Sequence, residues 1–170
     1  MAHKGKGKDS LETRQGLQEM NVRRELHAIV QADGKKKLPV ASWTLQKDEK
    51  EKICTFFDEM KVPTGYSSNI KRLVNTKELK FNMSCMKAHD CHVIMTQLLP
   101  VAIRGVLPVK VQDPIIKLCS FFNSISHKVI DLEMLDKLQQ DLVHAINRLE
   151  MHFPPTLFDI SVHLLVHLVS

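Results

Sequence analysis

Apolar residues recur at intervals of three and four along the second half of the chain, a pattern typical of helices that pack on one face. One such run begins after Ser84 and should be kinked or broken at Pro100, because proline lacks the N–H that the helix needs. A second is expected to start at Asp113-Pro114, where proline occupies its tolerated first position. A third begins at Asp131 and should stop at Pro154-Pro155.

The last segment is the most apolar in the chain. Thr156 is expected to cap a final helix that is apolar on most sides. Its apolar residues are Leu157, Phe158, Ile160, Leu164, Leu165 and Leu168. We therefore expect this helix to lie at the centre of the fold.

The first half of the chain predicts shorter elements. Ser10 is a possible cap for a helix through Met20. Short mixed runs on either side of Asp33-Gly34, a turn signal, can pair as a small hairpin, with Lys35-Lys36-Lys37 beside the turn as a solvated tip. Thr44 can cap a helix that runs to about Met60.

A connecting region follows that helix. Ser67 or Ser68 is expected to begin a shorter helix through Val74, and residues 75–84 form the expected internal loop. The pattern as a whole predicts an all-α fold, a bundle of about five to six helices with a possible small N-terminal β-hairpin. We expect a disordered basic tail over residues 1–10, then an N-terminal part over 11–84 and a helical core over 85–170, all in one domain.

Composition places the chain among ordinary soluble proteins. It has 170 residues, of which 44% are hydrophobic and 25% charged. No apolar segment follows the lysine-rich start, and the longest apolar run, Leu157–Val169, is too short to span a bilayer. The four cysteines have no regular spacing, so reduced thiols in an intracellular protein are expected.

The charge is unevenly distributed. Residues 61–87 carry six basic side chains against the single acidic Glu78. Such a band can meet the phosphates of DNA. A solvated, lysine-rich connector is the commoner explanation of the same pattern, and both remain open. The candidate DNA contacts are Lys61, Lys71, Arg72, Lys77, Lys80 and Lys87.

The residues with the richest chemistry are two groups at helical spacing. His89-Asp90-Cys91-His92 stands where a helix should begin, and His163 and His167 are four apart on the last helix. A pair from each of two packed helices makes a tetrahedral zinc site. A structural polar node, in which these side chains cap a helix start and line its polar edge, accounts for the same residues and is the preferred interpretation. No metal or other cofactor is therefore expected, with zinc or another divalent ion as the alternative.

Other catalytic chemistry has little support in the sequence. Cys54 and Cys119 lie on apolar helical faces and are expected to be small buried hydrophobes. Cys91 near a helix start would need a base and an oxyanion site to act as a nucleophile. There is no glycine-rich phosphate loop, and Asp90, Asp113, Asp131 and Asp159 are explained as helix starts or polar-stripe residues.

An ordered set of segments resembles a known family. The segments are Lys87–His92, Leu98–Pro108, Leu149–Pro155, Phe158–Ile160 and Val162–Leu168. Together they resemble the uncharacterised domain, a domain of unknown function, found downstream of the transposase domain in plant CACTA-type (En/Spm-like) DNA transposons. The resemblance runs from about Leu11 to the last residue. It implies a nuclear protein truncated at both ends, whose family's catalytic acids lie mainly outside this segment.

Two functions from different classes follow. The preferred hypothesis is a non-catalytic, transposase-associated domain that contacts DNA or other transposase segments, with no membrane partner. The alternative is a fragment of a metal-dependent transposase or nuclease in which the His-Asp-Cys-His group holds the ion. A remnant without independent activity is a third possibility.

Overall fold

The computed structural model describes residues 9–32, 34–61 and 69–168, without the side chains of residues 132, 161 and 163. Within these ranges the chain forms two compact units. The smaller unit joins the residues up to Thr44 with Glu150–Leu168, and the larger contains Leu45–Leu149. The expected boundary after residue 84 falls inside the larger unit. The expected tail and Ser67 and Ser68 lie almost wholly outside the described residues.

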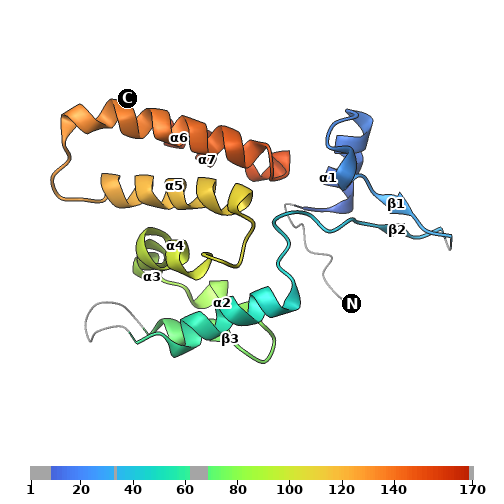
Figure 1. The fold of residues 1–170 in the computed structure, drawn as a ribbon, viewed down its shortest axis with the longest axis horizontal. Helices are drawn as coiled ribbons and strands as arrows, with labels where there is room; N and C mark the ends of the chain where they lie inside the picture. The colour runs from blue at the N-terminus through green and yellow to red at the C-terminus, as the bar shows by residue number, and fades with distance from the viewer. Residues whose placement is uncertain (1–8, 33, 62–68, 169–170) are drawn as a thin grey trace. The chain divides into compact units, whose positions relative to one another are not determined.

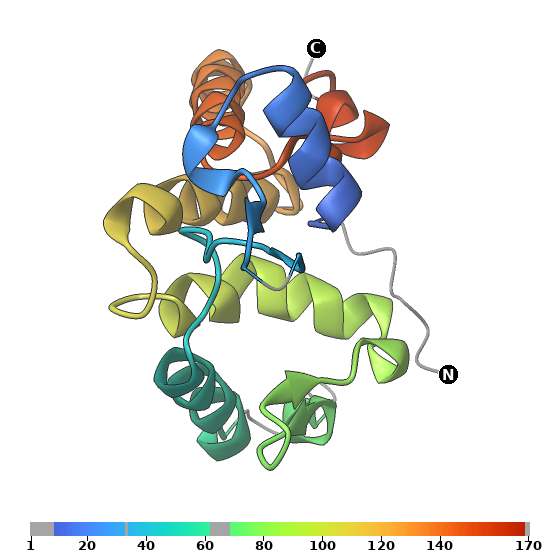
Figure 2. The ribbon, with the colours of Figure 1, turned by 90° about the vertical axis from the view of Figure 1, so that its right-hand side faces the viewer.

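The larger unit is built mainly of helices. In chain order they are α2 (Lys47–Glu59), α3 (Ala88–Val93), α4 (Leu99–Ala102), α5 (Val109–Ile125) and α6 (Leu135–Glu150). Figures 1 and 2 show α5 and α6 side by side and antiparallel, with the α3–α4 layer on the other side of α5 and α2 beyond it. The expected mostly helical fold is confirmed.

A small hairpin stands where a loop was expected between α2 and α3. Strands β3 (Val74–Asn75) and β4 (Lys80–Phe81) pair antiparallel, with Val74 opposite Phe81. A 3-10 turn precedes the hairpin (Ile70–Leu73) and another follows it (Met83–Cys85). The hairpin is therefore held between two short turns.

The core of this unit gathers side chains from α2, the first 3-10 turn and the α3–α4 segment. Its buried members are Ile53, Phe57, Ile70, Leu73, Val93 and Ala102. The Phe57 ring meets the ring of Phe81 edge to face, with centroids 5.0 Å apart. Ile53 and Phe57 are four apart and share one face of α2, so this helix presents a single apolar stripe to the core.

The start of α2 differs from the prediction. Gln46, not Thr44, precedes the helix, and its backbone N–H donates to Glu49 Oε2 at 2.7 Å. This bond satisfies one of the donors that a helix start leaves without an intrahelical partner. The prediction that Thr44 caps this helix was wrong. The Glu49 side chain bonds the backbone of Gln46, three residues before it, so Gln46 holds the cap position.

Pro100 interrupts the helix that begins at Ala88, as expected, but the interruption is a π turn. Residues Ile94–Leu98 form this turn, in which Leu99 N donates to Ile94 O. Thr96 is buried within it, and its hydroxyl donates to His92 O at 2.8 Å. The wider turn accommodates the proline, which then lies in the first turn of α4.

The expected helix start at Asp113-Pro114 is wrong. The helix begins four residues earlier, at Val109 after Pro108, and Pro114 lies inside it with its ring buried. Proline inside a helix costs about 3 kcal/mol, so tertiary packing must offset that cost here. Asp113 instead bridges two helices, because its Oδ2 accepts from Arg148 of α6 and lies 3.9 Å from Lys117 Nζ.

The helix expected from Asp131 is confirmed. Asp131 Oδ1 accepts from Glu133 N at 3.0 Å, and a 3-10 turn (Leu132–Met134) leads into α6. The buried residues of α6 recur at intervals of one, three and four, namely Leu142, Ala145, Ile146 and Leu149. They form the stripe that the sequence indicated.

In the smaller unit, α1 (Leu11–Glu19) is capped by Ser10, whose Oγ accepts from Thr13 N at 3.2 Å. The expected hairpin also forms, with β1 (Ile29–Val30) antiparallel to β2 (Lys36–Lys37) and Gly34 at φ +77° in the turn. A short 3-10 turn (Arg24–Leu26) connects the two. Leu17, Leu26 and Ala41 form its buried core, with Trp43 packed against them.

The last helix is shorter and more exposed than predicted. A 3-10 turn (Pro155–Leu157) comes first, and α7 spans Ile160–Leu165. Asp159 Oδ1, not Thr156, accepts from Val162 N. Leu164 is 52% exposed, so the expectation of a central helix was wrong. Phe158 leaves helical backbone geometry at ψ 71°, which separates the 3-10 turn from α7.

None of the helices in the described ranges is both long and apolar enough to cross a membrane.

Candidate nucleic-acid interface

Asp90 and Arg72 form an ion pair with one partner wholly buried. Asp90 is 0% exposed, and its Oδ2 accepts from the terminal nitrogen of Arg72 at 2.7 Å and from Lys87 N at 3.1 Å. The second of these bonds satisfies a backbone donor at the start of α3. A buried carboxylate requires such compensation, so the first turn of α3 and the guanidinium depend on each other.

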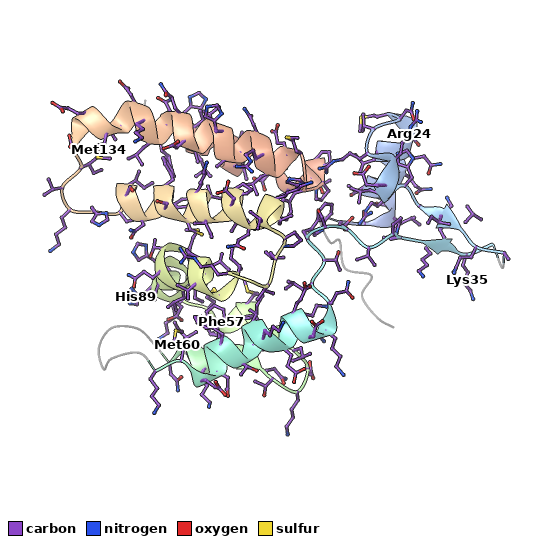
Figure 3. The ribbon with its side chains drawn as sticks, viewed as in Figure 1. Arg24, Lys35, Phe57, Met60, His89 and Met134 are labelled. Atoms are coloured by element: carbon purple, nitrogen blue, oxygen red, sulfur yellow. The ribbon has the colours of Figure 1, made fainter. Side chains whose placement is uncertain are left out.

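The other members of the His-Asp-Cys-His group face solvent. His89, Cys91 and His92 are exposed on α3, and Figure 3 shows His89 on the outside of the helix. Only Asp90 contributes to a buried polar node of the kind expected. Its partner, Arg72, was assigned to the DNA-contact band, so the sequence interpretation missed this pair.

The two histidine groups belong to different units. His89 and His92 lie in the larger unit, whereas His163 and His167 belong to the C-terminal segment of the smaller one. Among the described residues, no three His, Cys, Asp or Glu side chains gather in a group that could hold a metal ion. Because the side chain of His163 is outside the described set, convergence of the two pairs stays a prediction.

The basic band is partly neutralised from outside its own sequence. Lys71 pairs with Asp58 of α2 at 3.3 Å, and Arg72 pairs with Asp90 of α3. Lys80 lies 3.4 Å from Glu78 on the same hairpin. No carboxylate of the described residues pairs with the exposed side chains of Lys61, Lys77 or Lys87. These three lysines are the most available cations of the band.

A pocket of about 550 Å³ opens beside the β3–β4 hairpin. The residues that line it include Arg72, Asn75, Thr76, Lys77, Lys80 and Asn82. Asn75 Oδ1 accepts from Lys77 N and from Glu78 N, both at 3.1 Å, which fixes the hairpin turn. An Asn followed by polar residues was the available signal for this turn.

Two of the four cysteines are buried, as expected. Burial raises the pKa of the Cys119 thiol to about 11 and raises the pKa of Cys54 as well. Cys85 and Cys91 are exposed. The buried thiols are protonated at neutral pH, which suits small hydrophobic core residues.

The smaller unit contains a buried arginine that the sequence interpretation did not single out. Arg14 is 2% exposed, and its guanidinium donates to the Asp9 carboxylate and to Leu26 O at 3.0 Å. The same group lies over the ring of Trp43, which stacks on Phe153 with centroids 5.4 Å apart. This cluster joins α1 to the C-terminal segment and is fully engaged in structural contacts.

Comparison with protein families gives one match. The family described as "Domain of unknown function (DUF4218)" matches residues 125–170. The matched segment includes all of α6 and α7. Comparisons with curated proteins and with solved structures give no match.

Proposed function

We propose that this chain is a non-catalytic segment of a transposon-encoded protein that contacts DNA through its phosphates. The observation that carries the proposal is the set of exposed lysines on the larger unit. Lys61, Lys77 and Lys87 are exposed, and Lys71 and Lys80 make only surface ion pairs, each contributing about 0–1 kcal/mol. Such pairs are readily exchanged for pairs with phosphate.

The proposed transposon origin rests on the sequence resemblance alone. Residues 125–170 match a domain of unknown function, and that match does not itself point to a transposon. The segments from Lys87 to Leu168 resemble the domain that follows the transposase domain in plant CACTA-type elements. A DNA-contacting role would place the chain in the nucleus.

A non-catalytic role agrees with the arrangement around α3. Asp90, the carboxylate of the His-Asp-Cys-His group, is fully buried and paired with Arg72. It is therefore committed to holding the start of α3. The exposed His89 and His92 flank it on the solvent side of the helix.

The test is binding of the full chain to a fluorescein-labelled DNA duplex of random sequence, followed by anisotropy at increasing salt. We expect sequence-independent binding that weakens steeply with salt, because each neutralised phosphate releases counterions. Replacing Lys61, Lys77 and Lys87 with Gln should lower the slope of log affinity against log salt by about 3.

A matched control is available on the helical side of the same unit. Lys110, Lys128 and Lys137 are also exposed, so their replacement by Gln removes the same charge elsewhere. The control variant should keep most of the affinity. Absence of binding by the wild type at low salt, or equal losses in both variants, would overturn the proposal.

A further inference from the structure

We propose that the pocket beside the β3–β4 hairpin seats one phosphodiester group of a DNA strand, with Arg72 as a pre-oriented donor. This inference rests on the DNA contact proposed above and assigns it a specific site. It replaces a diffuse basic band with a defined group of hydrogen-bond donors. Three features of the pocket support it.

The first feature is the fixed position of Arg72. Its side chain lines the pocket and is 36% exposed, while one terminal nitrogen is bound to the buried Asp90. A guanidinium has five N–H donors in a rigid fork, so the bond to Asp90 leaves other donors for a ligand. Because Asp90 already orders the side chain, little conformational entropy remains to be lost on binding.

The second feature is that both asparagines of the pocket have their acceptor atoms engaged. Asn75 Oδ1 accepts two backbone N–H groups of the turn, and Asn82 Oδ1 accepts from Ser84 Oγ at 2.7 Å. Each side chain therefore has its NH₂ group left to offer, and an NH₂ group only donates. The pocket thus presents amide donors beside its cations.

The third feature is the charge of the remaining lining residues. Lys77 and Lys80 add two cations, and Glu78 adds one carboxylate paired with Lys80. Lys80 and Glu78 are 73% and 62% exposed, so their pair is weak and Lys80 can turn to a phosphate. Asp90 offsets the charge of Arg72 and Glu78 offsets that of Lys80, so Lys77 leaves a net positive charge at the pocket, which favours an anion.

A strand of DNA fits this site better than a small free anion. The pocket opens at an exposed hairpin, and a polymer seated there can continue across the surrounding surface of the same unit. Exposed Lys61, Lys71 and Lys87 belong to that unit and are available to neighbouring phosphates. A single seated phosphate with flanking lysine contacts is the expected mode of binding.

Two conservative substitutions test the site without removing its structural bonds. Asn75→Asp and Asn82→Asp keep the acceptor oxygen that the turn and Ser84 require, but they replace the NH₂ donor with a negatively charged oxygen. Asn147→Asp, on the exposed surface of α6, introduces the same charge away from the hairpin and serves as the control. Circular dichroism should show that all three variants keep the helical content of the wild type.

Binding is measured by anisotropy with a labelled single-stranded oligonucleotide and with an abasic version of the same length. We expect Asn75→Asp and Asn82→Asp each to weaken binding about tenfold, since each replaces a donor with a repelling charge. Asn147→Asp should change it by less than about twofold. The abasic strand should bind like the normal one, because a phosphate seat does not read bases.

The outcomes separate this inference from the proposed function. If the wild type binds DNA but all three variants bind equally, the pocket is not the seat, although the DNA contact stands. If the wild type fails to bind DNA, the proposed function fails, and the inference with it. Inorganic phosphate serves as the remaining probe, and binding of phosphate without DNA would identify a small-anion site and overturn the assignment to DNA.

Discussion

The Asp90 carboxylate and the Arg72 guanidinium are bonded at 2.7 Å, although 18 positions separate the two residues in the sequence. The pair connects the first turn of α3 to the turn that precedes the β3–β4 hairpin. Asp90 was a candidate metal ligand and Arg72 a candidate DNA contact. In the fold the two residues pair with each other. This one ion pair therefore holds both the start of α3 and the arginine of the proposed phosphate seat.

Removing one member of this pair should destabilise the protein. Arg72→Ala leaves the buried carboxylate without its cation and should lower the free energy of unfolding by about 1–3 kcal/mol, allowing for the partial exposure of Arg72. Lys71→Ala, which breaks an exposed pair, should cost at most about 1 kcal/mol. Urea denaturation followed by circular dichroism measures both losses. Equal losses would show that the buried pair stabilises the fold no more than the exposed pair does.

Truncating a side chain should cost far more stability in the core than in the last helix. Phe57 is buried among the core side chains, so Phe57→Ala should lower the free energy of unfolding by about 3–5 kcal/mol. Leu164 is half exposed, so Leu164→Ala should cost less than about 0.5 kcal/mol. Thermal and urea denaturation of the two variants give the comparison. A large loss in Leu164→Ala would mean that this face is covered in solution.

Thiol reactivity should divide the cysteines into two pairs. At pH 8 in the native protein, Cys85 and Cys91 should react readily with a thiol reagent because they are exposed. Cys119 should stay protected, since burial raises its pKa to about 11 and so keeps the unreactive protonated form, and Cys54 should behave likewise. Mass spectrometry of labelled peptides identifies the sites. Protection should disappear in urea, which serves as the internal control.

A chelator should leave the melting temperature unchanged if the histidines have only structural roles. A structural zinc ion would contribute its binding energy to folding, so its removal would lower the melting temperature markedly. Differential scanning calorimetry with and without EDTA, and again with added zinc, makes the comparison. A drop with EDTA that zinc reverses would favour the metal-dependent alternative, and His89→Gln and His163→Gln would then show which residues take part.

Local signals in the sequence predicted the elements that depend on neighbouring residues. Ser10 caps α1, and the Asp33-Gly34 signal coincides with the hairpin of β1 and β2. The signal at Asp113-Pro114 misled because a proline that usually begins a helix is instead buried inside one. In that case burial outweighed local preference, and only the fold shows which side chains become buried.

The candidate site was less accessible to sequence reasoning than the fold. The charge of residues 61–87 was visible, but the carboxylates that neutralise part of it come from α2 and α3. A single sequence does not show which acidic side chain pairs with which basic one. The Asn75 turn, by contrast, depends on bonds spanning two and three residues and could have been predicted.

The π turn at Ile94–Leu98 sets the rotational phase between two parts of the core. In an uninterrupted α-helix, the nine steps from Val93 to Ala102 would place the side chains of these two residues about 180° apart. The extra residue of a π turn reduces this angle to about 80°, so both residues reach the same buried cluster. Without the π turn, a segment of the same length would stay helical but would swing Ala102 away from the core, whereas deleting one residue in this turn should give a regular α-helix that keeps the angle of about 80°. The π turn therefore lets this segment hold one residue more than a regular α-helix while Val93 and Ala102 still face the same cluster.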